Sequence, residues 1–328
     1  MSILTRKTMV YAEVESTYGT AASFSDSTSP ILVENADYML DIQTINRPIY
    51  RSDLSPVADI IGRKIGKIKF THELRGGGVV GTETGVRAAA DGYTLTLGSG
   101  SYATSAALNE LSYDPVRDIT PIILVGDSPF IMTVNPGVAA NTLQELIRLA
   151  KAKPGSLSYG TTGTGGITHL AVELFDMLAG TQMVPIPYKG TAPALNDAIA
   201  GQIPVMLGTA PSTLPHVRSK RLRALAVTSA QRSSFAPDLP TVAEAGVPRY
   251  EAITWYAVWG PKKLPAAIIA RLNAEFAKAL AVPDVRRKFE VEALEIRGGS
   301  PQVLEALIAR EIAKWKTVVQ KANLKATP

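Results

Sequence analysis

From about residue 93 the chain alternates short apolar runs with amphipathic stretches. The apolar runs, rich in β-branched residues and bounded by Gly, Pro or Asn, predict strands at 93–98, 120–126, 130–135, 157–160, 184–188, 203–208, 222–228 and 254–260. The amphipathic stretches predict helices at 142–152, 168–179, 192–200, 265–281 and 301–322. Strands that alternate with helices are typical of α/β layers, so we expect mainly parallel sheets.

Three helix ends carry recognisable signals. Asn141 with Gln144 resembles a capping box at the start of a helix. Gly180 follows the helix that begins near Thr168, at the position where a left-handed residue commonly ends a helix. "SP" at 300–301 fits an N-cap followed by proline at the first helical position.

The pattern changes near "HELRGGGVVGTETG", residues 72–85. Upstream stretches mix β-branched and polar residues between clusters of Ser, Thr, Asp and Gly, so we expect residues 1–77 to be mostly β. Residues 78–328 have the α/β pattern, and a chain of 328 residues is long enough for two domains. The change fits either an unusual N-terminal domain before an ordinary one or a fusion of two unrelated pieces.

Composition excludes several classes of protein. With 46% hydrophobic and 19% charged residues the chain is globular, and no apolar run reaches the ~18 residues that span a membrane. The N-terminus shows no signal peptide. Cysteine is absent and the three histidines lie far apart, so we expect no metal site and no cofactor. The net charge of +5 favours anionic ligands, but "RSKRLR" at 218–223 is expected to be a solvated turn, not a nucleic-acid site.

The stretch "SYGTTGTGGITHL", residues 158–170, combines a strand end, a glycine-rich turn and a helix start. No Lys follows the glycines, and Thr168 stands where a dinucleotide motif needs its third glycine, so nucleotide binding is not expected. Main-chain N–H groups and the positive end of the helix dipole suit a small anion, and Gly163, Gly165 and Gly166 permit positive φ. The threonines add hydroxyl donors. From these residues alone, a turn that serves packing only is an equal alternative.

A series of ordered motifs runs through the second part of the chain: "AAADGYTLTLGS", "YDPVRDITPI", "PGSLSYGTTGTGGITHLAVELF", "IPYKGTAPALNDAIAGQIPVML", "LPHVRSKRLRALAVTS", "DLPTVAEAGVPRYE" and "WYAVWGPKKLP". In these motifs the chain, over about residues 78–328, resembles the solute-binding proteins of tripartite tricarboxylate transporters, the Bug family. The resemblance implies an α/β fold in the form of a two-lobed periplasmic-binding-protein-like clamp. Two strands, near "FIMTVNP" and "TWYAVWGP", would cross between the lobes.

The resemblance also implies a domain division. Residues 129–252 would form the second lobe, and residues 78–128 plus 253–328 the first. The first lobe would be incomplete, because the family's N-terminal strand, Pro/Gly-rich turn and helix have no counterpart in residues 1–77. Instead, "RKIGKIKFTHELRGGG" resembles a phage tail protein fragment, so the chain has the character of a fusion. A missing central strand would leave neighbouring backbone groups unpaired.

In the family the glycine-rich turn contacts a ligand carboxylate, and three further turns would face the same cleft, each at the carboxyl end of a strand. These turns are "GSGSY" (98–102), "YKGTAP" (188–193) and "LGTAP" (207–211). The predicted ligand-binding residues are Ser99, Ser101, Thr162, Gly163, Thr164, Gly165, Thr168, Tyr188, Gly190, Thr191, Gly208 and Thr209.

Several side chains near these turns have an ordinary structural interpretation. Thr191 is expected to be an N-cap, Lys189 to be solvated, and His169 to have a capping or packing role. Family members often carry an Asp near Gly208 or Thr209 that suits a ligand amine. Its absence here predicts a ligand without an amine.

No catalytic set stands out, so we expect a binding protein and no enzyme. GxSxG and HExxH motifs are absent, and the acidic pair Glu173 and Asp176 is expected on a solvated helix face. The resemblance implies a periplasmic protein that captures a small organic acid for membrane transporter subunits, weakened here by the lost N-terminal turn. We expect a monomer. The alternative, argued from residues 1–77 alone, is a phage tail structural protein.

Overall fold

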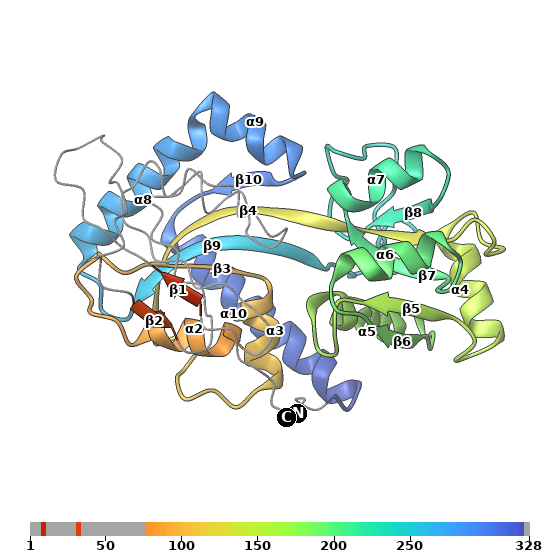
Figure 1. The fold of residues 1–328 in the computed structure, drawn as a ribbon, viewed down its shortest axis with the longest axis horizontal. Coiled ribbons are helices and arrows are strands. Elements are labelled where there is room, and N and C mark those ends of the chain that lie inside the picture. The colour runs from red at the N-terminus through yellow and green to blue at the C-terminus, as the bar shows by residue number, and fades with distance from the viewer. Residues whose placement is uncertain (1–7, 11–30, 34–76, 325–328) are drawn as a thin grey trace.

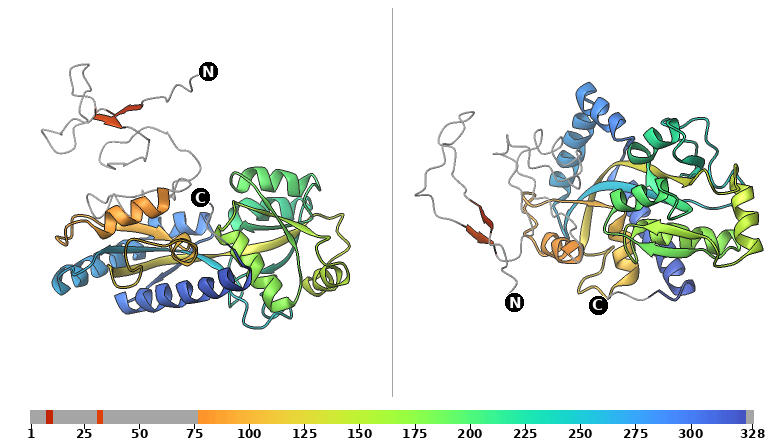
Figure 2. Two further views of the ribbon diagram at one scale, coloured as in Figure 1. Left: turned by 90° about the horizontal axis from the view of Figure 1, so that it is seen from below. Right: turned by 45° about the vertical axis from the view of Figure 1, so that its right-hand side comes forward.

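The structure, a computed structural model, describes residues 8–10, 31–33 and 77–324 of the chain. Eight strands form one sheet, and its two halves lie in two lobes joined by long strands (Figures 1 and 2). No helix in the described ranges has the length and apolar character needed to cross a membrane. The strands of the sheet are β3 (Thr96–Ser99), β4 (Ile119–Val134), β5 (Ser158–Thr161), β6 (Val184–Pro187), β7 (Val205–Thr209), β8 (Arg223–Val227), β9 (Ile253–Pro261) and β10 (Glu295–Gly298).

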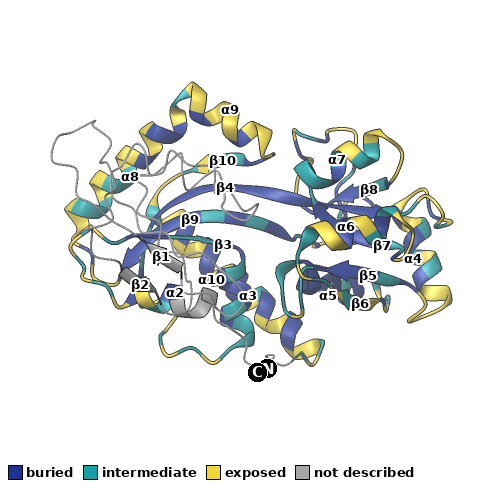
Figure 3. Ribbon diagram, in the orientation of Figure 1, coloured by how far each residue is buried: buried dark blue, intermediate teal, exposed yellow. Residues whose placement is uncertain are grey.

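Strand β4 passes through both halves of the sheet. Its first part, up to Pro129, pairs with β9 and β10, and its last part, from Phe130, pairs with β7 and β8. Every residue from Ile122 to Val134 is buried, and Figure 3 shows the strand dark blue over this length. The sequence predicted two strands here, at 120–126 and 130–135. The structure joins them, because the polar residues Asp127 and Ser128 keep their pairing with β9.

The expectation of mainly parallel sheets was wrong. Within the described sheet only the pairings of β5 with β6 and β7 are parallel, and β4 and β9 pair antiparallel with all their neighbours. Two strands of one lobe run parallel when a crossover helix connects them, as for β5 and β6. Strand β4 instead enters the second lobe directly from the first, and it runs antiparallel to β7 and β8 there.

Helices cover both faces of the sheet. In the first lobe α8 and α9 pack on one face around Phe276 and Phe289, and α3 and α10 pack on the other around Trp259 and Trp315. The helices are α2 (Gly77–Val86), α3 (Ser101–Leu108), α4 (Leu143–Ala152), α5 (Ile167–Ala179), α6 (Thr191–Ile199), α7 (Ala210–Arg218), α8 (Ala266–Ala281), α9 (Pro283–Val291) and α10 (Pro301–Lys321). All five predicted helices are confirmed, as α4, α5, α6, α8 and α10.

Helices α2, α3, α7 and α9 and strand β10 were not predicted. The sequence of α2, "GGVVGTETGV", is rich in glycine, which is a poor helix former. Helix α7 contains Pro215, whose ring removes one N–H donor from the helix interior. Helix α3, "SYATSAAL", carries no charged residue that would mark a polar face. Tertiary packing therefore overrides weak local signals in these segments.

Two of the predicted helix ends are confirmed and one is displaced. Gly180 ends α5 with φ +66°, and Ser300 precedes Pro301 at the start of α10. The N-cap of α4 is Thr142, not Asn141, and its hydroxyl accepts the N–H of Glu145 at 3.2 Å. The acidic residue of this capping box is Glu145, in place of the predicted Gln144. Its carboxylate accepts the Asn141 N–H at 2.6 Å. A carboxylate is favoured over an amide here because it also interacts with the helix dipole.

The structure describes two short stretches of the N-terminal segment that the sequence predicts to be mostly β. Strands β1 (Thr8–Val10) and β2 (Ile31–Val33) form an antiparallel pair that is not hydrogen-bonded to the eight-stranded sheet. The rest of the expected β-rich segment, up to residue 76, lies outside the described residues.

The burial of β4 predicts a large cost for truncating its side chains. Ile131 is fully buried between helix α7 and strand β8, so Ile131→Ala should lower the free energy of unfolding by about 3 kcal/mol. Val303, half exposed on α10, is the control. Val303→Ala should change the free energy of unfolding by less than about 0.5 kcal/mol. Urea denaturation measures both. Similar losses for the two variants would contradict the packing described here.

Candidate functional site

Three of the predicted turns lie at one edge of the sheet. Strand β5 runs parallel to β6 and β7, so the segments that follow these strands leave the sheet on the same side. The main-chain N–H of Tyr188 donates to the carbonyl of Thr161 at 2.9 Å, which ties the second turn to the first. The structure thus brings together the predicted residues of 162–168, 188–191 and 208–209.

The fourth turn approaches from the other lobe. Ser99 ends β3 and Ser101 begins α3, and their hydroxyl oxygens are 2.7 Å apart. Gly100 between them packs against the backbone of β9 at Ile253, at the start of this crossing strand. On the other side of the crossing, Thr209 pairs with Phe130 of β4. Both lobes therefore contribute a predicted turn next to the crossing strands.

The glycine-rich turn uses several of its donors internally. The N–H of Thr162 donates to the Thr168 hydroxyl at 3.1 Å, and the N–H of Gly163 donates to the Thr161 hydroxyl at 3.1 Å. The N–H of Gly165 donates to His169 Nδ1 at 2.9 Å. The donors expected at Thr162, Gly163 and Gly165 are thus occupied within the turn, and the hydroxyl of Thr168 is buried.

Other donors remain at the start of helix α5. The main-chain N–H groups of Thr164, Ile167 and Thr168 have no acceptor among the described residues. The N-cap residue Gly166 has no side chain that could accept them. These groups stand at the positive end of the helix dipole, and Thr164 is exposed. The arrangement can bind one carboxylate without a cationic side chain.

Glycine is required at position 165 for two reasons. Its φ is +76°, a left-handed conformation, and a Cβ at this position would lie 2.6 Å from Leu108 Cδ1 of α3. Gly163 also has a positive φ, +136°, but has open space around it. Gly166 has φ −67° and does not need this freedom. The contact with Leu108 brings the turn of the second lobe against a helix of the first.

Behind the turn lies a group of polar side chains. The expected capping or packing role of His169 agrees with its burial and its acceptance of the Gly165 N–H. The carboxylate of Glu173 accepts the hydroxyl of Tyr159 at 3.0 Å and lies 3.4 Å from His169 Nε2. Burial, followed by the negative charge of Glu173, raises the pKa of Tyr159 above its usual range.

The expectation of a solvated acidic pair on α5 was wrong. The side chain of Glu173 is 20% exposed, and Asp176 is buried. Asp176 accepts the Thr181 hydroxyl at 2.5 Å and the Met183 N–H at 2.7 Å, just beyond the helix end. Burial raises the pKa of its carboxyl, and these two hydrogen bonds offset part of that rise. The alternation of polar residues on α5 gave no signal of these tertiary contacts.

The second and third turns contain mainly structural side chains. The Tyr188 hydroxyl donates to Asp197 at 2.7 Å, and burial together with this bond raises the pKa of Tyr188 to about 12. Gly190, with φ +112°, is the N-cap of α6, so Thr191 is its first residue and not the predicted cap. A Cβ at Gly208 would collide with Thr213 of α7, which leaves no room for an acidic side chain there.

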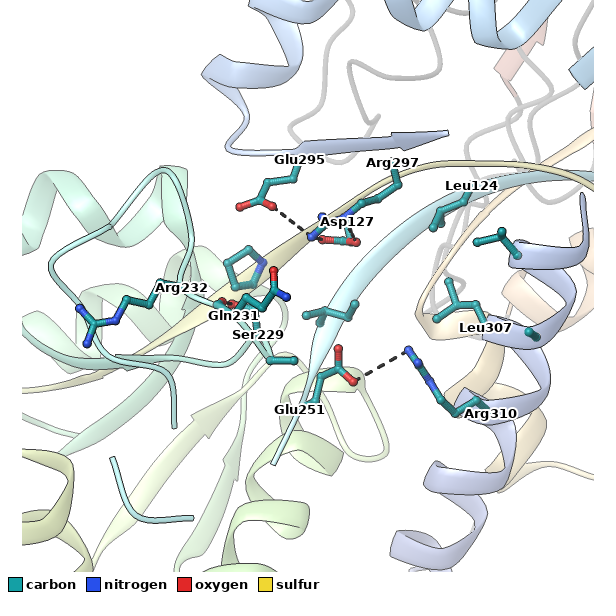
Figure 4. Close-up of a pocket in the computed structure, with 15 residues that line it drawn as sticks. Leu124, Asp127, Ser229, Gln231, Arg232, Glu251, Glu295, Arg297, Leu307 and Arg310 are labelled. Carbon is teal, nitrogen blue, oxygen red and sulfur yellow. Dashed lines mark hydrogen bonds and ion pairs between the residues drawn. The ribbon is translucent and has the colours of Figure 1, made fainter. Parts of the chain in front are cut away.

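A separate cavity of ≈ 600 Å³ lies beside the crossing strands (Figure 4). None of the predicted site residues lines it. Arg297 donates to both oxygens of Asp127, at 2.6 and 3.0 Å, and to Glu295 at 3.0 Å, while Arg310 lies 3.9 Å from Glu251. The charges in this cavity therefore neutralise one another and define no ligand charge.

The described part of the chain contains no cluster of three His, Asp or Glu side chains placed to hold a metal ion.

The close contact at Gly165 predicts a steric cost that can be separated from backbone strain. Gly155 has nearly the same φ, +77°, but no neighbour within 4 Å of a Cβ. Gly155→Ala should therefore cost about 1 kcal/mol of unfolding free energy, and Gly165→Ala a further 1–3 kcal/mol, roughly. Adding Leu108→Ala should recover the further part in a double-mutant cycle. Equal costs for the two alanine variants would contradict the contact between the turn and α3.

Comparisons with known proteins agree on one family. The sequence profile of the "Tripartite tricarboxylate transporter family receptor" matches residues 59–324. Protein BugT of Bordetella pertussis is 37% identical over 257 residues, which covers 76% of this chain and 77% of BugT. The structure of Rpa4515 from R. palustris with adipate has a TM-score of 0.70 at 31% identity, covering 82% of this chain and 91% of that one. MatC from Rhodopseudomonas palustris with bound malate has a TM-score of 0.67 at 28% identity, covering 80% and 93%.

The match begins at residue 59 and not at residue 78. The change of pattern at 72–85 therefore lies inside the matched region and does not mark its start. The resemblance drawn from the motifs and the two-lobed α/β fold are confirmed: the chain belongs to the tripartite tricarboxylate transporter receptor family.

Proposed function

We propose that this protein is a periplasmic solute-binding receptor that captures a small carboxylate and delivers it to the membrane subunits of a tripartite tricarboxylate-type transporter. The observation that carries the proposal is the start of α5, where three main-chain N–H groups without an acceptor among the described residues meet the helix dipole. Relatives with adipate and with malate support a dicarboxylate as the ligand class. The family is one of receptors, and binding needs no catalytic group.

The ligand would lie between turns of the two lobes. Ser99 and Ser101 offer hydroxyls from the first lobe, and Thr164 offers a hydroxyl and an N–H from the second. The tight packing of Gly208 against Thr213 supports a ligand without an amine, because no carboxylate can stand at that position to bind one. A dicarboxylate would place one carboxylate at α5 and the other toward the serines.

The two lobes would move relative to one another around the crossing strands. Strand β4 changes partners between Pro129 and Phe130, and β9 begins at Ile253. These positions support lobes at 78–128 plus 253–328 and at 129–252. We propose a monomer, because each copy of the chain carries turns from both lobes.

The family match leaves out the N-terminal residues of the chain. Residues 1–58 lie outside the match, whereas the phage-tail-like stretch "RKIGKIKFTHELRGGG", residues 63–78, lies inside it near its start. We propose that a foreign segment replaces the N-terminal strand and turn of the family, and that the replacement weakens ligand binding. A phage tail structural protein is the alternative function, argued from this segment alone.

A ligand screen tests the proposed function. Adipate, malate or citrate at 100 times its Kd should stabilise the protein by about 2.7 kcal/mol, measured as a rise in melting temperature. Aspartate and ATP are the controls and should give no rise. Stabilisation by aspartate or ATP alone would contradict the proposal, and ring-shaped assemblies in electron micrographs without any carboxylate response would favour the structural alternative.

Removing one donor at α5 tests the site. Ile167 is the first residue of the helix, a position that tolerates proline, and the extended Gly166 before it suits a residue preceding proline. Ile167→Pro deletes one N–H and should weaken binding by about 1.5–3 kcal/mol, roughly 10- to 150-fold in Kd. Ala266→Pro, at the first residue of the distant helix α8, is the matched control and should bind normally. Calorimetric titration with adipate measures both, and unchanged affinity in the first variant would remove α5 from the site.

A further inference from the structure

Three contacts lie behind the glycine-rich turn. Tyr159 lies in β5, before the turn, and its hydroxyl donates to Glu173 of α5, after the turn. Glu173 faces His169 Nε2 at 3.4 Å, and His169 Nδ1 accepts the Gly165 N–H within the turn at 2.9 Å. The contacts therefore link the strand, the helix and the backbone of the turn in one series.

The hydrogen bond from Gly165 shows which tautomer His169 adopts in the structure. A main-chain N–H can only donate, so Nδ1 must carry a lone pair, and the proton of the neutral ring lies on Nε2. Nε2 makes no hydrogen bond within the described residues, but it lies 3.4 Å from the Glu173 carboxylate, whose negative charge favours a proton there. From other elements, the Tyr159 ring of β5 lies 6.3 Å from the His169 ring between centroids, and the apolar Leu108 of α3 lies against the turn at Gly165. Glu173 is therefore the charged group that sets the tautomer.

We propose that Glu173 and His169 are a positioning pair: Glu173 holds the proton on Nε2, His169 holds the N–H of Gly165, and together they keep the turn in its binding conformation. Neither side chain needs to touch the ligand. With Gly165 held at φ +76°, the N–H groups of Thr164 and Ile167 stay free for a carboxylate. This inference rests on the proposed carboxylate site and adds the residues that set its affinity.

Two substitutions of His169 separate positioning from simple packing. The amide oxygen of asparagine can take the place of Nδ1, whereas that of glutamine reaches the place of Nε2. His169→Asn should therefore keep the Gly165 hydrogen bond and bind adipate within about threefold of the unaltered protein. His169→Gln should lose the bond and bind about tenfold more weakly. Calorimetric titration of the full chain with adipate and malate measures both, alongside their melting temperatures.

A purely structural role predicts another outcome. If His169 only fills space, both variants should lose affinity in proportion to their loss of melting temperature, and glutamine, closer in size, should be the milder change. That order, or equal affinity in all three proteins, would overturn the proposal. Better binding by His169→Asn than by His169→Gln at similar melting temperatures would support it.

A ligand-free measurement keeps the inference separate from the proposed function. Nitrogen-15 NMR of the imidazole should show Nδ1 unprotonated and Nε2 protonated in the unaltered protein. Glu173→Met should mix the two tautomers and speed hydrogen exchange at the Gly165 amide, whereas Glu305→Met, an exposed control on α10, should leave both unchanged. A protonated Nδ1, or an unchanged tautomer in Glu173→Met, would overturn the positioning pair. If no carboxylate binds the unaltered protein, the proposed function fails, and the NMR result still decides whether Glu173 and His169 hold the turn.

Discussion

The two-lobed fold depends on one continuous strand ladder. Strand β4 hydrogen-bonds to four other strands, two in each half of the sheet. A strand in this position has neighbours on both edges and side chains buried on both faces, so its residues must be small or apolar, or must bond to a partner within the fold. Thr133 shows the second solution, because its buried hydroxyl donates to the carbonyl of Met206.

The crossing strands also determine where a ligand site can form. Turns from both lobes reach the point where β4 changes partners, through Thr209 on one side and Gly100 on the other. The neighbouring cavity lies near the same strands, but two of its arginines, Arg297 and Arg310, already bind Asp127, Glu251 and Glu295. Burial raises the pKa of Asp127, and the bonds from Arg297 offset part of this cost, so the pairing contributes to the fold rather than to binding.

The glycine-rich turn shows how a site can be both rigid and free to bind. Side chains of its own segment occupy the N–H groups of Thr162, Gly163 and Gly165. Those bonds fix the backbone, and the remaining N–H groups at the helix start are then held in place without an internal partner. A turn with every donor free would be flexible and would lose more conformational entropy on binding.

The sequence by itself determined the family, seven of the eight strands of the main sheet, five of the nine described helices, and the helix ends at Gly180 and Ser300. These features depend on local signals, such as a glycine that can adopt positive φ, which are present in a single short stretch. The glycine-rich turn could be predicted for the same reason. Helix α7, with its internal Pro215, shows the limit of such signals.

Only the tertiary structure decided how distant residues meet. It joined two predicted strands into β4, reversed the expected parallel pairing, and placed Leu108 against Gly165 and Glu173 beside His169 and Tyr159. Glu173 would be solvated on an isolated helix, whereas in the fold Tyr159 of β5, the strand before the turn, donates to its carboxylate. Contacts of this kind depend on how helices and strands pack together. The local sequence around a residue does not show which distant residue will pack against it.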